Sequence, residues 1–170
     1  MADAPGAQDP VGLARRLGAM IYDGLLLLAI WMVLGLLFVF LGQATGYALI
    51  PLQFVANLLA AWAFFAWFWT RTGQTLGMQT WQIRVCAEDG GPVTPWRATL
   101  RYLVALAQWL GLLFAVHLAR QSGALSATLV TALVLTGLGL SQLHPRRRML
   151  HDWLSRTVLV KTPREKATTT

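Results

Sequence analysis

The chain has 170 residues, of which 56% are hydrophobic and only 12% are charged, against about 45–50% and 25% in average soluble domains. This composition excludes an ordinary soluble helical protein, because several separate apolar runs of membrane-spanning length would have no dry place to pack. The net charge of +7 does not indicate nucleic-acid binding, since anionic lipid headgroups attract the same basic residues, and the single cysteine, Cys86, excludes an internal disulfide.

The first apolar segment predicts a transmembrane helix with one acidic residue inside it. Residues 1–12 have no periodic apolar pattern and are expected to form a flexible tail. Arg15 and Arg16 precede a run from Leu17 to Leu41 in which Asp23 is the one ionisable residue. About 25 residues at 1.5 Å each give a helix of about 37 Å, longer than the bilayer's hydrocarbon core of about 30 Å.

A second span, Leu49 to Trp69, ends in aromatic residues of the kind found at membrane interfaces. The loop that follows contains a turn at Gly73–Gly77. Every second residue from Trp81 to Val85 is apolar, which is typical of a strand. The turn residues 88–92 come next, and Val93 begins a return strand. We therefore expect a small β-hairpin between the second and third helices.

The third and fourth spans follow from cap and hydropathy signals. Thr94 and Pro95 are a helix N-cap and first residue, and the third helix is expected from Pro95 to about Leu118. The fourth is expected over residues 124–143. Residues 149–161 have an apolar stripe among polar residues, which predicts a segment lying along the interface, and residues 162–170 form a second tail.

The predicted fold is thus an all-α membrane protein, a four-transmembrane-helix bundle over residues 13–161 with a small loop hairpin. All Lys and Arg except Arg120 lie before the first span, around the loop from 70 to 101 or after the fourth span. The positive-inside rule places these regions and both termini in the cytoplasm.

Asp23 is the main candidate for chemistry, because an ionised carboxylate near the centre of a bilayer costs about 2.5–3.5 kcal/mol. It is expected to have an arginine partner, Arg97 or Arg101, to bind a cation or proton, or to reach the interface. Arg16 is expected to stay with lipid phosphates. Asn57, in the middle of the second span, is the next candidate ion ligand. No catalytic, metal or cofactor motif is present, and His151–Asp152 lacks a nucleophile.

Three stretches together resemble the RDD family of small bacterial and archaeal membrane proteins, named for one Arg and two Asp. They read RRLGAMIYDGLLL, TGQTLGMQTWQIRVCAEDGGPVTPWRATLRYL and RRRMLHDWLSRTVLV. The resemblance implies that Arg16 (or its neighbour Arg15), Asp23 and Asp152 are the motif residues. The family often has a lysine where this chain has Met78. The resemblance also implies a plasma-membrane location and transport, including sodium–proton exchange.

Asp152 is expected near the cytoplasmic surface, paired with Arg71, Arg97 or Arg101, so that it ties the C-terminal segment to the loop. Two functions follow from this reading. One is a monovalent-cation or proton (Na+/H+) transporter that uses Asp23 and acts as a homo-oligomer. The other is a non-transporting accessory or scaffold protein, whose loop and basic C-terminal segment contact anionic lipid headgroups or a partner protein. An enzymatic role is not expected.

Overall fold

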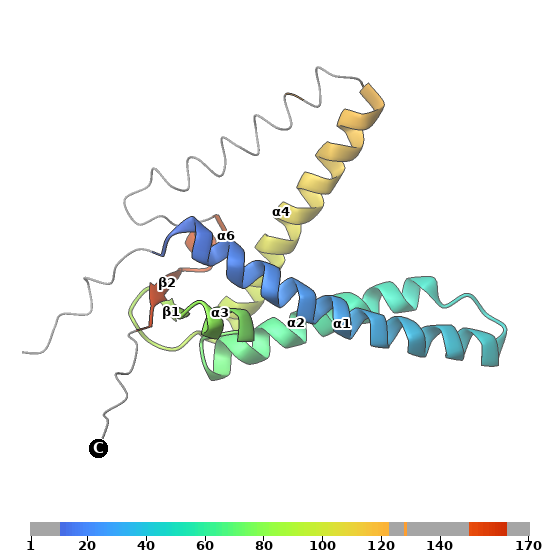
Figure 1. Cartoon of the computed structure of the whole chain (residues 1–170), viewed down its shortest axis with the longest axis horizontal. Helices are drawn as coiled ribbons and strands as arrows, with labels where there is room; N and C mark the ends of the chain where they lie inside the picture. The colour runs from blue at the N-terminus through green and yellow to red at the C-terminus, as the bar shows by residue number, and fades with distance from the viewer. Residues whose placement is uncertain (1–10, 123–127, 129–149, 163–170) are drawn as a thin grey trace, which may run out of the picture.

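The computed structural model of the chain describes residues 11–122, 128 and 150–162 (Figure 1). This part of the chain contains three long helices, two short helices and two short strands. In chain order they are α1 (Leu13–Thr45), α2 (Ile50–Arg71), α3 (Leu76–Thr80), β1 (Ile83–Ala87), α4 (Pro95–Ser122), α6 (Leu150–Leu154) and β2 (Thr157–Lys161).

The three long helices are each long and apolar enough to cross a membrane. Helices α1 and α2 run side by side as a hairpin, and α4 leaves in a different direction after packing its first turns on α2 (Figure 1). Gly46 closes α1 with a left-handed φ of 73° and donates its backbone N–H to the Gly42 carbonyl at 2.9 Å. The first three predicted spans are therefore present: α1 extends four residues beyond the prediction at each end, α2 agrees with it to within two residues, and α4 ends four residues later. The fourth, at 124–143, lies outside the described residues apart from residue 128.

The large apolar side chains of the spans point mostly outward. Ile21, Met32, Val33 and Leu113, for example, are all more than half exposed. In a soluble protein such surfaces would drive aggregation. On helices of spanning length they are the surfaces that face lipid. The chain is thus a multi-pass membrane protein.

The predicted hairpin is wrong, because β1 pairs with a strand from the far end of the chain. The two strands are antiparallel, with Ile83 opposite Lys161 and Ala87 opposite Thr157. The turn after β1 does form, and the Ala87 N–H donates to the Gly91 carbonyl at 3.0 Å. A return strand does not follow, because Pro92 lacks an N–H and α4 already begins at Pro95. The segment Thr157–Lys161 instead offers three β-branched residues, Thr157, Val158 and Val160, which favour a strand.

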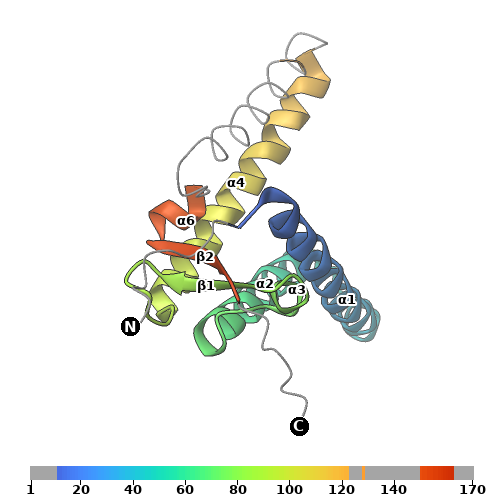
Figure 2. The ribbon, with the colours of Figure 1, turned by 60° about the vertical axis from the view of Figure 1, so that its left-hand side comes forward.

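Within the C-terminal segment expected along the interface, Leu150–Leu154 forms the short helix α6 and Thr157–Lys161 forms β2. Figure 2 shows α3, β1, β2 and α6 gathered where α1 begins, α2 ends and α4 begins. We call this end of the molecule the basic end, after its exposed arginines Arg15, Arg71, Arg84 and Arg156. The buried apolar core lies mainly here, and includes Val11, Ala19, Trp69, Met78, Ile83, Val85, Val93, Ala98 and Tyr102.

Candidate functional site

Asp23 lies on the third turn of α1, buried at 4% exposure, and its carboxylate is bound by the segment around α3. Its Oδ1 accepts a hydrogen bond from the Gly77 backbone N–H at 2.9 Å, and its Oδ2 accepts one from the Thr75 hydroxyl at 2.5 Å. The Thr75 oxygen in turn accepts from the Met78 N–H at 3.2 Å, so that Thr75 is the N-cap of α3. Asp23 therefore fastens α3 to α1.

Two glycines allow α3 to lie this close to α1. A Cβ on Gly77 would stand 2.4 Å from the Ala19 carbonyl oxygen and 2.9 Å from Asp23 Oδ1. A Cβ on Gly18 would stand 2.2 Å from the Trp81 ring. Any larger residue at these positions would push the loop away from the helix, and Asp23 would lose its donors.

The expected ion pair of Asp23 with Arg97 or Arg101 is wrong. Arg101 binds Asp152, and Arg97 forms an ion pair with the exposed Asp89 at 3.6 Å. Among the residues that the structure describes, Asp23 has no cationic partner, because the hydroxyl and N–H of the α3 segment occupy both of its oxygens.

Asp152 is the centre of a second, fully buried cluster. Its Oδ2 accepts from Arg16 Nη1 at 2.8 Å, and its Oδ1 binds Arg101 Nη1. Arg101 Nη1 also donates to the Thr157 hydroxyl at 2.7 Å. We call Arg16, Arg101 and Asp152 the clasp, because they join the starts of α1 and α4 to α6. Of the three arginines expected to pair with Asp152, Arg101 does so, whereas Arg71 lies over the Trp67 ring at 4.4 Å. One expectation is corrected, because Arg16 is buried against Asp152 and does not stay with lipid phosphates.

A neutral histidine and two hydroxyls complete the surroundings of the clasp. His151 Nδ1 lies 3.1 Å from Gln108 Oε1, which accepts from the Nδ1–H tautomer, and His151 Nε2 lies 3.6 Å from Asp152 Oδ1. Burial, assisted by the positive charge of Arg101, lowers the pKa of His151 to about 4. His151 is therefore uncharged at neutral pH. Ser155 Oγ donates to the His151 carbonyl at 2.5 Å and lies 2.9 Å from Thr157 Oγ1.

Asn57 does not join Asp23. Its backbone carbonyl accepts from the Trp31 indole N–H at 3.0 Å, and Trp31 is eight residues beyond Asp23 on α1, which is about 12 Å along the helix axis. The Asn57 side-chain oxygen is buried and meets no donor within the described residues. The two candidate ion ligands thus stand at different depths in the bundle.

The sequence matches the model of a known protein family. The model of the RDD family matches residues 10–156, which is most of the chain. The chain belongs to the RDD family. No curated protein and no solved structure matches it.

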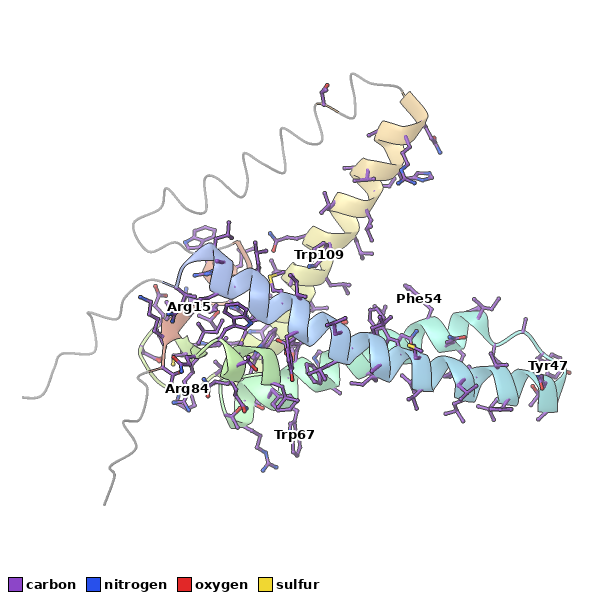
Figure 3. All side chains as sticks on the ribbon, viewed as in Figure 1. Arg15, Tyr47, Phe54, Trp67, Arg84 and Trp109 are labelled. Carbon is purple, nitrogen blue, oxygen red and sulfur yellow. The ribbon has the colours of Figure 1, made fainter. Side chains whose placement is uncertain are left out.

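The fold also distinguishes between the two candidates for the arginine of the RDD motif. Arg16 is 4% exposed and binds Asp152. Arg15 is exposed on the surface of the basic end, as Figure 3 shows. Met78, at the position where RDD proteins often have a lysine, lies in the apolar core. In this chain that position therefore contributes packing and no charge.

Sequence reasoning missed the residues that complete both sites, Thr75 and Gly77 at Asp23 and Thr157 at the clasp. The GQTLG stretch predicts a turn, and its threonine is also of a residue type that favours a helix N-cap. That signal is available in the sequence for Thr75. No local signal marks Thr157, which meets Arg101 only because β2 pairs with β1.

Proposed function

We propose that this RDD protein is a non-transporting accessory or scaffold protein of a bacterial or archaeal plasma membrane. In this proposal the basic end faces the cytoplasm and contacts anionic lipid headgroups or a partner protein. One observation supports it above all: both acidic residues of the motif are used to fasten the basic end to the helices. Asp23 holds α3 on α1, and Asp152 holds α6 on α1 and α4.

The distribution of charge supports the proposed orientation. Arginines are exposed on α1, α2 and β1 at the basic end, and Figure 3 shows Arg15 and Arg84 there. The connection at the other end of the α1–α2 hairpin, near Tyr47, has no charged residue. Basic residues stay preferentially on the cytoplasmic side of a membrane and bind its anionic lipids.

The surface pocket on the α1–α2 hairpin lies far from Asp23, which agrees with a role for Asp23 in holding the fold. A surface pocket of about 400 Å³ lies between Phe38 and Gln53, at the opposite end of the α1–α2 hairpin. Phe38 is fifteen residues from Asp23, which is about 22 Å along α1. Nothing in that pocket belongs to the motif, so it gives no route between Asp23 and the other side of the membrane.

Transport of a monovalent cation or a proton is the second candidate, and one specific observation favours it. Asp23 is a buried carboxylate inside a membrane-spanning helix, without a cationic partner in the described part of the chain. Ionisable residues in such positions often carry protons or ions. In this candidate a homo-oligomer would supply the helices that a pathway needs.

Reconstitution of the full chain into liposomes tests the proposal. Cation-driven proton flux is measured for the wild type, for Asp23→Asn and for Asp89→Asn, a matched change at an exposed acid. We expect wild-type flux equal to that of protein-free liposomes. Flux above that level in the wild type contradicts the proposal. If Asp23→Asn then loses the flux and Asp89→Asn keeps it, transport through Asp23 replaces the proposal.

A further inference from the structure

Arg71 is the last residue of α2, and its guanidinium lies over the ring of Trp67, one helical turn earlier. The guanidinium carbon is 4.4 Å from the centre of the ring, which is a cation–π contact. Trp67 is more than half exposed at the basic end (Figure 3), and Arg71 is exposed as well. We call these two residues the Trp67–Arg71 pair. The ring thus holds a charged group in place on the surface of the protein.

The Arg71 guanidinium has no acceptor among residues 11–122, 128 and 150–162. It donates to no carbonyl there and forms no ion pair there. Arg97 and Arg101, by contrast, each bind a carboxylate. A guanidinium has five N–H donors and a permanent positive charge. At Arg71 these donors are accessible from outside and remain available for a ligand.

Arg71 does not act as a cap for its own helix. Arginines near a helix C-terminus can donate to the last carbonyls. Here the Phe68 carbonyl accepts from the backbone N–H groups of Thr72 and Gly73, both at 3.0 Å, and from the Thr72 hydroxyl at the same distance. The guanidinium of Arg71 is instead turned back over Trp67. Closure of α2 therefore does not explain its position.

The Trp67–Arg71 pair lies at the depth where lipid phosphates are found. The 22 residues of α2 give a helix of about 33 Å, against about 30 Å for the hydrocarbon core. Its last turn is thus at the level of the headgroups, where tryptophans are enriched. Arg84 adds positive charge beside this turn, because its Cγ lies 3.1 Å from the position of a Cβ on Gly73.

We infer that the Trp67–Arg71 pair binds the phosphate group of an anionic lipid. The phosphate oxygens accept from the Arg71 guanidinium, whose fork of donors matches them, and the exposed indole lies beside the headgroup. This inference rests on the proposed function and deepens it, because it names lipid as the contact of this part of the basic end. A free phosphate ion presents the same chemistry, so the test must separate the two sources.

The test compares Arg71→Gln and Trp67→Leu with the wild type in the full-length protein. The matched control is Arg15→Gln, because Arg15 is also exposed at the basic end, on the first turn of α1, but contacts no aromatic ring in the described part of the chain. Each protein is purified in a neutral detergent and titrated with phosphatidylglycerol, phosphatidylcholine or inorganic phosphate. The readouts are the thermal midpoint and the lipid dissociation constant from native mass spectrometry of the folded protein.

We expect phosphatidylglycerol to bind the wild type and Arg15→Gln equally well and to raise the thermal midpoint of both. Arg71→Gln should bind it about ten-fold more weakly, the effect of losing hydrogen bonds to a charged acceptor. Trp67→Leu should bind it about three-fold more weakly, because the guanidinium is kept but no longer held over a ring.

Equal weakening in Arg71→Gln and Arg15→Gln would overturn the inference, because diffuse attraction by surface charge would then explain the binding. Equal affinity of the wild type for phosphatidylcholine would overturn the assignment to anionic lipid. Stabilisation by inorganic phosphate, with none by phosphatidylglycerol, would overturn the assignment to lipid. None of these readouts depends on ion flux, so failure here and failure of the proposed function are distinguishable.

Discussion

Because Gly77 has no side chain beyond a hydrogen atom, the α3 segment can lie directly against α1. Its backbone N–H reaches Asp23 only because nothing separates α3 from the Ala19 carbonyl. The carboxylate, in turn, receives its donors only when α3 is in place. The two residues are fifty-four positions apart in the chain, and each has its role only because of the other.

Substitution of Gly77 by alanine should therefore destabilise the protein. The added methyl would overlap the Ala19 carbonyl oxygen at 2.4 Å, and forced overpacking costs about 1–3 kcal/mol. The free energy of unfolding in detergent micelles measures the effect. The matched control is Gly24→Ala on α1, where nothing lies within 4 Å of the added Cβ. Similar losses in both variants would show that α3 does not rest on α1 as described.

At the scale of elements, the β1–β2 pair connects the loop after α2 with the C-terminal segment. Two strands alone are marginally stable in water. Here they are supported from one face, because Ile83 and Val85 are buried in the core. On the outer edge of β1, the Val85 N–H donates to the Gly73 carbonyl at 2.8 Å, and Gln74 Nε2 donates to the Ile83 carbonyl at the same distance. The small sheet is thus stabilised by its surroundings.

The strand register can be tested with the one native cysteine. Cys86 stands opposite Val158, and directly opposed residues on paired strands have the Cα separation that a disulfide requires. We expect Val158→Cys to form an internal disulfide with Cys86 under mild oxidation, detected as a mass loss of two hydrogens. Leu159→Cys, whose side chain points to the other face of the sheet, should not. A disulfide in the second variant alone would mean that the register is shifted by one residue.

At the scale of the whole molecule, the clasp brings together the two ends of the chain. Arg16 and Asp152 are 136 residues apart, and Arg101 lies between them in sequence. One carboxylate thereby joins the first helix, the last span that the structure describes and the C-terminal segment. Breaking a buried ion pair is costly, because the remaining charges are left buried and uncompensated.

Asp152→Asn should accordingly lower the free energy of unfolding by about 3–5 kcal/mol, and it should make the C-terminal segment sensitive to protease. Asp89→Asn changes the same kind of side chain in an ion pair with Arg97, but there Asp89 is 67% exposed. Such pairs contribute about 0–1 kcal/mol, so this control should behave like the wild type. If both variants were equally stable, the clasp would not hold the basic end together.

The sequence by itself determined the membrane class and the positions of three spans. In lipid, backbone groups must be satisfied within the segment, so length and hydropathy suffice to identify a helix. Thr94 and Pro95 likewise specify the start of α4 through local backbone chemistry alone, and the Arg97 N–H does reach the Thr94 hydroxyl at 3.4 Å. Such signals depend on residues a few positions apart, so they can be recognised without knowledge of the fold.

The tertiary structure alone decided which groups meet. A buried carboxylate accepts equally from a guanidinium, a hydroxyl or a backbone N–H, so the sequence did not distinguish Arg101 from Thr75 and Gly77 as partners of Asp23. Strand propensity also did not say whether β1 would pair with residue 93 or with Thr157–Lys161. These choices depend on segments that are distant in the chain and become neighbours only when the helices place them at the same end of the molecule.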